Sequence, residues 1–316
     1  MNQIPSVDLR DFLSDNEQTK SMFVQTIGKA FQEIGFCAVR GHFLDDDLVN
    51  SLYSQIKLFF DLPNDVKRKY EHPEFSGQRG YVSFGKESAK GSKHGDLKEY
   101  WHFGQYISEK EISKYNYFPN IIVDELPEFN KVGEEVYKTL EKTAKYVLRA
   151  LAIYLEIDEN YFDNYIKNGN SILRPIHYPP ITEDPKEAVR AAAHGDINLI
   201  TLLMGAHGKG LQVQNTKGEW IDAVASEDEL MINIGDMLSR HTNNVLKSTV
   251  HRVVNPDKEL LKKSRYSIPF FMHPISEMKL NVLESTICDE FPKAYEDITA
   301  GEFLEERLIE LGLLKK

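Results

Sequence analysis

The sequence predicts an α+β protein with a mainly β core, a jelly roll that is flanked by helices and preceded by a helical N-terminal region. Between about residues 171 and 275, short β-branched and apolar runs are separated by Gly, Asn, Asp or Pro, which is typical of strands. Before that stretch, apolar residues recur every three or four positions, which is typical of helices with one buried face. Short strands that follow a helical region favour a sandwich or open barrel of the jelly-roll kind.

Helices are expected mainly in the first half of the chain. From Pro127 to about Leu155 the apolar residues step by three and four, which predicts a long helix whose apolar stripe is core rather than a cofactor site. A similar spacing predicts a helix over 16–34, which Gly35 ends. Further helices are expected over about 45–60, from Pro63, over 158–167 and over 300–313. The buried face of the helix over 16–34 is expected to comprise Met22, Val24, Ile27, Ala30, Phe31 and Ile34.

The expected strands are short. They lie at 4–9, 36–39, 172–176, 197–204, 211–213, 230–234, 249–254 and 266–271. The segment 73–98 differs, because it is rich in Gly, Ser, Lys and Glu, and it predicts a long surface loop. We therefore divide the chain into an N-terminal region, 1–120, and a second part, 121–316, with the long helix, the jelly-roll core and the C-terminal helix. The two parts are expected to pack as one compact unit.

Charge and composition disfavour several classes of protein. The net charge is −11 and the sequence pI is about 5.5, and no basic patch or basic amphipathic helix is present, so we expect neither nucleic acid nor a membrane surface as a partner. Two cysteines in 316 residues give no disulfide framework, and the N-terminus has no signal-peptide pattern, so a reducing cytoplasm is expected. The partner expected is a small-molecule substrate, and the sequence leaves the oligomeric state open.

A metal site is predicted from His194-Gly195-Asp196 and a later histidine, His251. The first pair lies where the strand 197–204 is expected to begin, and residues two apart in a strand point to the same face. His251 lies in the expected strand 249–254. Two imidazoles and one carboxylate that leave other positions open are the ligand set of non-haem iron(II) oxygenases, in which O₂ and a co-substrate must both reach the metal.

Other histidines compete for these roles. His94-Gly95-Asp96 has the same spelling as the first pair, but it lies in a polar segment without a strand and is expected in a solvated loop. His207, His241 and His273 are alternatives to His251, and each is expected in a turn or at a strand end rather than as a ligand. His251 by itself could also be a core histidine bonded to backbone.

Arg265 and Ser267 lie on the next expected strand and share one face of it. A guanidinium binds a carboxylate bidentately and a hydroxyl adds a further hydrogen bond, so the pair is suited to the distal carboxylate of 2-oxoglutarate. The other end of that molecule could then chelate the iron. Tyr178, before Pro179, could donate a hydrogen bond to the co-substrate or be a structural tyrosine ahead of a turn.

Taken together, these residues resemble the isopenicillin N synthase-like group of 2-oxoglutarate- and iron(II)-dependent dioxygenases, and the likeness covers nearly the whole chain. The resemblance implies a double-stranded β-helix, iron ligation by His194, Asp196 and His251, carboxylate binding by Arg265 and Ser267, and an oxo-acid contact at Tyr178. One departure is Ile176, where plant members often carry Asn. The motifs are Ile4-Pro5, Gly35-Phe36, Phe59 to Pro63, Tyr178-Pro179-Pro180, His194-Gly195-Asp196, Leu199 to Leu203, Gly210 to Val213, Gly235-Asp236, His251-Arg252-Val253 and Arg265-Tyr266-Ser267.

The resemblance also implies an activity. We expect a dioxygenase that oxidises a small organic molecule and releases succinate and CO₂, with no catalytic side chain beyond the metal ligands. Hydroxylation is the expected outcome, with desaturation and ring closure as alternatives. Family halogenases lack the metal carboxylate, so Asp196 disfavours halogenation. The alternatives are an oxidase that does not use 2-oxoglutarate, of the isopenicillin N synthase or aminocyclopropanecarboxylate oxidase type, a zinc hydrolase, and a binding protein without catalysis. Succinate release and metal analysis distinguish them.

Substrate contacts are harder to predict. Related enzymes place such contacts in the region that corresponds to Gln78 to Tyr81, so Arg79 and Tyr81 are candidates, with a solvated arginine as the alternative. Phe271 is a candidate pocket residue, with plain core as the alternative.

Overall fold

The computed structural model describes residues 3–86, 97–180, 191–205, 210–254 and 262–310. Its strands are β1 Ser6–Asp8, β2 Phe36–Arg40, β3 Gly80–Val82, β4 Glu99–His102, β5 Ile172–Leu173, β6 Ile176–Tyr178, β7 Ala191–His194, β8 Ile200–Met204, β9 Leu211–Gln214, β10 Trp220–Asp222, β11 Leu230–Ile234, β12 His251–Val253 and β13 Arg265–Met272. Its helices are α1 Leu9–Phe12, α2 Glu17–Glu33, α3 Asp46–Phe60, α4 Asn64–Arg68, α5 Glu109–Tyr115, α6 Pro127–Tyr154, α7 Asp163–Ile166, α8 Asp236–His241 and α10 Ala300–Glu310, with 3-10 turns η1 Pro73–Phe75 and η2 Glu284–Thr286.

The strands form a nine-stranded sheet and a four-stranded sheet. The larger sheet has the order β1-β2-β11-β8-β13-β6-β4-β3, with β5 paired to β13, and the smaller has the order β10-β9-β12-β7. Together they form the jelly roll, a double-stranded β-helix flanked by helices, and the predicted fold class is confirmed. None of the described helices combines the length and apolarity that a bilayer-spanning helix needs.

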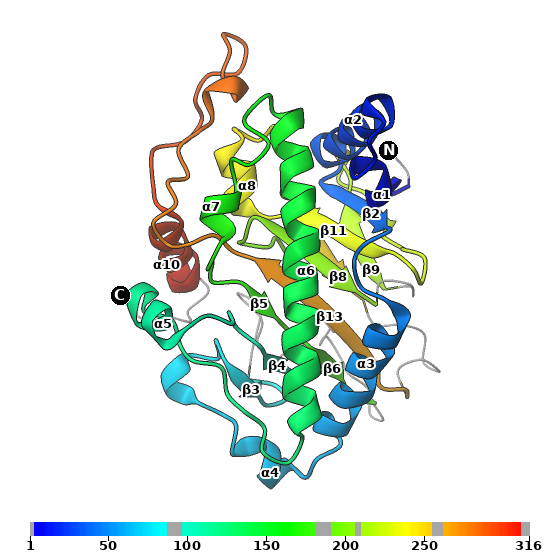
Figure 1. Cartoon of the computed structure of the whole chain (residues 1–316), viewed down its shortest axis with the longest axis vertical. Helices are drawn as coiled ribbons and strands as arrows, with labels where there is room; N and C mark the ends of the chain where they lie inside the picture. The colour runs from blue at the N-terminus through cyan, green and yellow to red at the C-terminus, as the bar shows by residue number, and fades with distance from the viewer. Residues whose placement is uncertain (1–2, 87–96, 181–190, 206–209, 255–261, 311–316) are drawn as a thin grey trace.

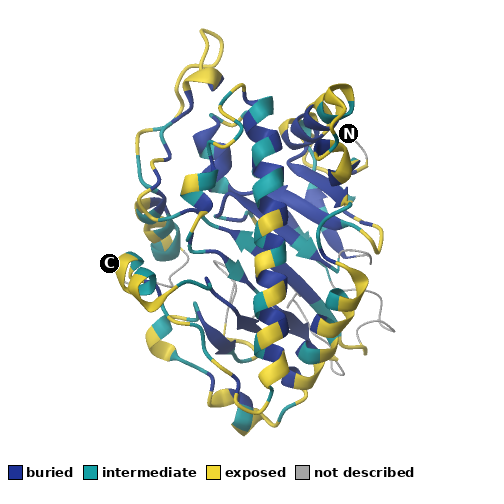
Figure 2. Ribbon diagram, in the orientation of Figure 1, coloured by how far each residue is buried: buried dark blue, intermediate teal, exposed yellow. Residues whose placement is uncertain are grey.

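Helix α6 covers the outer face of the larger sheet and runs across its strands (Figure 1). Its stripe of Val136, Leu140, Val147 and Leu151 is fully buried, while the opposite side of the helix faces solvent (Figure 2). The stripe packs with apolar residues of α2, α3 and the sheet into one core, as the spacing of apolar residues predicts. The helices thus cover the outer face of the larger sheet, and its inner face is left for a functional site.

Alternation along the strands separates these two faces. On β13, Tyr266 stacks on His177 and Phe270 packs edge-on against Tyr137 of α6, so these two side chains belong to the outer face. Arg265, Ser267 and Phe271 are the alternate residues of the same strand and lie on the inner face. The inner face of one strand therefore carries two predicted co-substrate contacts and one predicted substrate contact.

Several sequence predictions about local structure are wrong. Met22 is 64% exposed, and its neighbour Phe23 takes the buried position in α2. The expected strand 172–176 is two strands, β5 and β6, because Pro175 between them has no N–H to donate to a neighbouring strand. The expected helix over 158–167 is helical only in α7. The segment 73–98 contains β3, which pairs with β4 and adds an edge to the sheet.

Candidate active site

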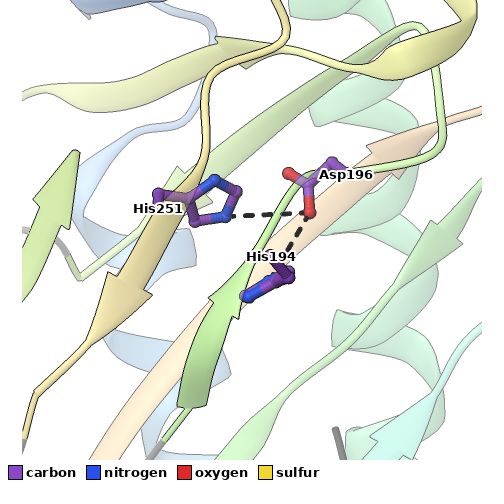
Figure 3. Close-up of side chains that lie close together, drawn as sticks. All are labelled: His194, Asp196 and His251. Carbon is purple, nitrogen blue, oxygen red and sulfur yellow. Dashed lines mark ion pairs between the residues drawn. The ribbon is translucent and has the colours of Figure 1, made fainter. Parts of the chain in front are cut away.

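The three predicted metal ligands lie together. His194 is the last residue of β7, His251 is the first residue of β12, and the two are paired in register across the smaller sheet. The Oδ1 atom of Asp196 lies 3.9 Å from the Nε2 atom of His194 and 3.8 Å from the Nε2 atom of His251. One candidate ligand atom of each residue lies within 4.8 Å of the others, and Figure 3 shows the side chains converging. This cluster is the only such group of His, Cys, Asp or Glu found among the residues that the structure describes.

The expected reason for this convergence was wrong. His194 ends β7 instead of beginning the strand that follows, and Asp196 lies in the loop before β8, so the two do not share a strand face. Asp196 is positioned by the larger sheet, because its Oδ2 atom accepts hydrogen bonds from Thr201 of β8 at 2.6 Å and Asn233 of β11 at 2.8 Å. The site therefore joins the two sheets, and its carboxylate depends on two polar residues that the sequence prediction missed.

Backbone contacts orient both imidazoles. The Nδ1 atom of His194 lies 2.7 Å from the carbonyl oxygen of Ala192, and that of His251 lies 3.1 Å from the carbonyl oxygen of Thr249. A carbonyl can only accept, so each Nδ1 donates a proton and Nε2 is the nitrogen left for a metal. Such backbone contacts are the usual way that a metal-binding histidine is held in the correct tautomer.

The electrostatics of Asp196 and His251 favour metal binding. Burial raises the pKa of the Asp196 carboxyl, but His251, His194 and the hydrogen bonds from Asn233 and Thr201 outweigh burial and hold that pKa below its usual value. Burial lowers the pKa of His251. An ionised carboxylate and neutral imidazoles are the forms that ligate a divalent ion. The side chain of Asp196 is 7% exposed and that of His194 is 47% exposed, so the cluster is open on one side.

The competing histidines lie elsewhere. His94 and His207 are outside the described residues. His241 is not in a turn, as was predicted; it is a buried residue of α8, and its Nε2 atom lies 3.0 Å from the hydroxyl of Tyr161. His273 follows β13, and burial lowers its pKa to about 4. Neither belongs to the triad.

The predicted carboxylate anchor lies on the inner face of β13. Arg265 is paired in register with Tyr178 of β6, and its Cζ atom lies 5.5 Å from the centre of that ring. The Nη1 atom of Arg265 is buried and makes no hydrogen bond with the described residues. A buried guanidinium nitrogen without an acceptor is costly, and an anion would satisfy it. Ser267 pairs with Ile176, which packs with Tyr178 and Tyr100 into a small apolar cluster.

The three predicted substrate contacts have different surroundings. Phe271 lies on the inner face of β13, where the Cζ atom of Arg174 is 5.1 Å from its ring centre. Tyr81 does not join it, because its ring packs against Phe59 of α3 and its hydroxyl donates to Glu99 on the outer face. The structure therefore separates Tyr81 from the metal ligands.

Arg79 is not solvated, contrary to the alternative considered from the sequence. It is 1% exposed and donates to the carbonyl oxygen of Gln78 at 2.7 Å and to Oδ1 of Asn170 at 3.1 Å. Its guanidinium lies over Gly104, where a Cβ would be only 1.9 Å from Nε, so a residue without a side chain is required there. Two further inner-face side chains, Tyr100 and His102 of β4, were not predicted at all.

Comparison with known proteins agrees with this geometry. Residues 4–125 match the model of the N-terminal region of non-haem dioxygenases in morphine synthesis, and residues 167–274 match the 2OG-Fe(II) oxygenase superfamily. The proline hydroxylase buaE of Petromyces alliaceus is 30% identical over 323 residues, which span 98% of this chain and 99% of that protein. The chain belongs to the 2OG-Fe(II) oxygenase superfamily.

Solved structures of similar oxygenases cover the whole fold. A 2OG-Fe(II) oxygenase family protein from Caulobacter crescentus is 40% identical with a TM-score of 0.90, over 98% of this chain and 99% of that one. A full-length Neurospora crassa protein, solved in complex with α-KG (2-oxoglutarate) and thymine, is 30% identical with a TM-score of 0.86, over 97% of this chain and 96% of that one. This 2OG-Fe(II) oxygenase is accordingly an iron(II)- and 2-oxoglutarate-dependent dioxygenase, and the zinc hydrolase and non-catalytic alternatives are disfavoured.

Proposed function

We propose that this dioxygenase hydroxylates a small organic molecule at a site in which His194, Asp196 and His251 hold iron(II) and Arg265 and Ser267 bind 2-oxoglutarate. The observation that carries the proposal is the pairing of two features. Imidazole Nε2 atoms converge with a carboxylate, and β13 carries a buried Arg265 nitrogen that has no hydrogen-bond partner among the described residues. One feature suits a ferrous ion and the other suits the far end of a dicarboxylate.

The donor set fits iron(II). Two neutral imidazoles and one carboxylate suit a borderline divalent ion better than Mg²⁺ or Ca²⁺, which prefer oxygen ligands. No cysteine is present in the cluster, which disfavours a structural zinc site of the thiolate type. With iron(II) bound, the site supplies oxidation of a C–H bond by O₂, coupled to the conversion of 2-oxoglutarate into succinate and CO₂.

The protein's own residues would bind and orient the co-substrate and exclude water. The planar guanidinium of Arg265 would donate two hydrogen bonds to the distal carboxylate of 2-oxoglutarate. Ser267, on the same face of β13, would add a third. Tyr178 pairs with Arg265 and would fix one wall beside the co-substrate. Ile176, in place of the Asn of many plant relatives, makes this part of the wall apolar, so contacts to the co-substrate would come from β13 and Tyr178.

Hydroxylation is the outcome that the relatives support best. One relative is named a proline hydroxylase, and another is solved with 2-oxoglutarate and thymine. Both are small polar molecules, and this chain resembles both proteins over nearly its full length. We further infer a reducing cytoplasmic setting, in line with Cys37 and Cys288 both being free thiols.

Succinate release tests the proposal. The purified enzyme should convert 2-oxoglutarate to succinate only when iron(II) and O₂ are both present, and a chelator should stop it. Asp196→Ala should abolish release, because the carboxylate ligand is lost. Arg240→Gln is the control, since Arg240 is a partly buried residue of α8 that packs against Tyr295 and Phe303 and is not one of the proposed ligands, and it should leave release unchanged. Undiminished succinate formation by Asp196→Ala would disprove the assignment of the ligands.

A further inference from the structure

A buried polar network lies on the outer face of the larger sheet, behind the strands that carry the proposed co-substrate contacts. It contains Lys67 of α4, Glu99 of β4 and His177 of β6, which are all buried. The Nζ atom of Lys67 donates to the Oε2 atom of Glu99 at 2.9 Å and to the carbonyl oxygen of Phe60 at 3.0 Å. A buried ion pair is costly unless its remaining hydrogen bonds are made. The proposed reaction itself uses none of these side chains.

Glu99 is the centre of this network. Besides Lys67, the hydroxyl of Tyr81 and the Nδ1 atom of His177 donate to its carboxylate, the latter at 2.8 Å. Burial raises the pKa of Glu99, but the hydrogen bonds that it accepts, of which that from His177 contributes most, outweigh burial and hold that pKa below its usual value. An ionised carboxylate can only accept, so Nδ1 of His177 is fixed as a donor.

The other nitrogen of this imidazole contacts the residue that precedes β13. The Nε2 atom of His177 lies 3.1 Å from the hydroxyl oxygen of Ser264. The same ring stacks on Tyr266, with ring centres 4.9 Å apart and planes 15° apart. Ser264 and Tyr266 flank Arg265 in the sequence, and Tyr178, the residue after His177, is paired in register with Arg265. His177 therefore contacts the chain on both sides of the proposed carboxylate anchor.

Strand alternation separates this network from the co-substrate. Tyr266 points to the outer face of β13 and Arg265 to the inner face, so contacts on the outer face can hold the backbone of Arg265 without touching a ligand on the inner face. A residue that binds a ligand does so best when neighbouring hydrogen bonds hold its own position, because less freedom is then lost on binding.

We propose that His177, held by Glu99 and hydrogen-bonded to Ser264, positions Arg265 for the distal carboxylate of 2-oxoglutarate. This inference rests on the proposed function and adds two residues to the same site. His177 and Ser264 are positioning residues, because they act through Arg265. Neither is a proposed metal ligand, so only the interaction with the distal carboxylate should depend on them.

Two oxo acids test this proposal. 2-Oxovalerate has a methyl group where 2-oxoglutarate has its distal carboxylate, so the ratio of the two dissociation constants isolates the contribution of the carboxylate anchor. Both constants are measured by calorimetry on the iron(II)-loaded enzyme without O₂. We expect wild-type enzyme to bind 2-oxoglutarate at least about 10-fold more tightly than 2-oxovalerate, since hydrogen bonds to a charged group are lost in the second acid.

Substitutions at Ser264 give the main test. Ser264 is exposed, so Ser264→Ala should fold normally. We expect this variant to bind 2-oxoglutarate about 3- to 10-fold more weakly, as for the loss of one hydrogen bond, with 2-oxovalerate binding, kcat and iron content unchanged. Ser264→Thr keeps the hydroxyl and should restore binding. Ser51→Ala, at an exposed serine of α3, is the control and should bind both acids as wild type does.

A substitution of the imidazole tests the other end of the contact. In His177→Asn the amide can still donate to Glu99, which keeps the buried carboxylate satisfied, but it is too short to reach Ser264. We expect a selective loss of 2-oxoglutarate binding at least as large as in Ser264→Ala, because the stacking on Tyr266 is also lost. Adding Ser264→Ala to His177→Asn should weaken binding no further, since both changes break one interaction.

The contrary results have distinct meanings. An unchanged ratio of the two dissociation constants in Ser264→Ala, equal weakening of both acids, or a parallel loss of iron would overturn the positioning role. A wild-type enzyme that binds both acids equally would instead contradict the carboxylate anchor at Arg265, and the proposed function with it.

Discussion

The two sheets of the barrel contribute differently to the site. The four-stranded sheet supplies both imidazoles, His194 and His251, on paired strands. The nine-stranded sheet supplies the groups that hold Asp196 in place and carries Arg265, Ser267 and Phe271 on its inner face. The smaller sheet therefore supplies two of the three predicted metal ligands, while the larger sheet holds the third in place and carries the residues that we propose bind organic ligands. We therefore expect that substituting an imidazole alters metal binding, and that substituting a residue on the inner face of β13 alters the binding of organic ligands.

Removing an imidazole from the smaller sheet should have the largest effect. His251→Ala leaves two ligands, so we expect turnover to fall at least about 1,000-fold together with loss of bound iron. Succinate release and iron content measure both. His72→Ala, which removes a histidine near η1, is the control and should behave as wild type. Iron retained at full occupancy in His251→Ala would remove this histidine from the ligand set.

Altering the larger sheet should change co-substrate binding instead. Arg265→Gln removes the charge beside Tyr178, and we expect the KM for 2-oxoglutarate to rise about 10- to 100-fold while iron content stays the same. Steady-state kinetics over a range of 2-oxoglutarate concentrations check this. Loss of iron in parallel would contradict the expectation that Arg265 affects co-substrate binding without affecting the metal.

A pH effect should arise outside both sheets. Burial lowers the pKa of His241 to about 4, from an ordinary value of 6.5. Between these values the unfolded chain binds a proton that the folded chain does not, so stability falls as the pH drops below about 6.5. From pH 7 to pH 5 the loss should be about 2 kcal/mol, from 1.36 kcal/mol per pKa unit. Urea unfolding at both pH values should show that His241→Asn loses less stability than wild type over this interval.

The smallest effect tests the link between the sheets. Thr201→Val keeps the shape of the side chain but removes the hydroxyl that donates to Asp196. We expect metal affinity to fall about tenfold, the lower end for groups that support a ligand. Thr201→Ser keeps the hydroxyl and is the matched control. Equal metal affinities of the two variants in a titration would argue that Asn233 alone positions the carboxylate.

The sequence predicted what local patterns determine. The stripe of α6 and the alternation of β13 depend on the side-chain period, and both are as expected. The His194–Asp196 pair was predicted correctly as a cluster but for a wrong reason, because a loop and two distant strands hold Asp196. Its position depends on pairing between β8 and β11, which no local pattern specifies.

The inner-face residues of β4 were not predicted, for a related reason. Tyr100 and His102 alternate with Glu99 and Trp101, and this alternation was a signal for a strand that the polar composition of 73–98 obscured. The direction in which the ring of Tyr81 points depends on the pairing of β3 with β4, which no local pattern specifies. Contact with Arg174 requires β4, β6 and β13 to be neighbours, which only the assembled sheet establishes.

The pairing of β7 with β12 is irregular, since its register shifts between His251 and Val253. Sliding such strands past each other by a single position turns every side chain over, so one imidazole would leave the interior. Only the correctly aligned pair of strands presents both rings to the same ion. Binding of a ferrous ion would therefore stabilise this register of β7 and β12 relative to shifted registers, and metal binding would be coupled to correct strand pairing.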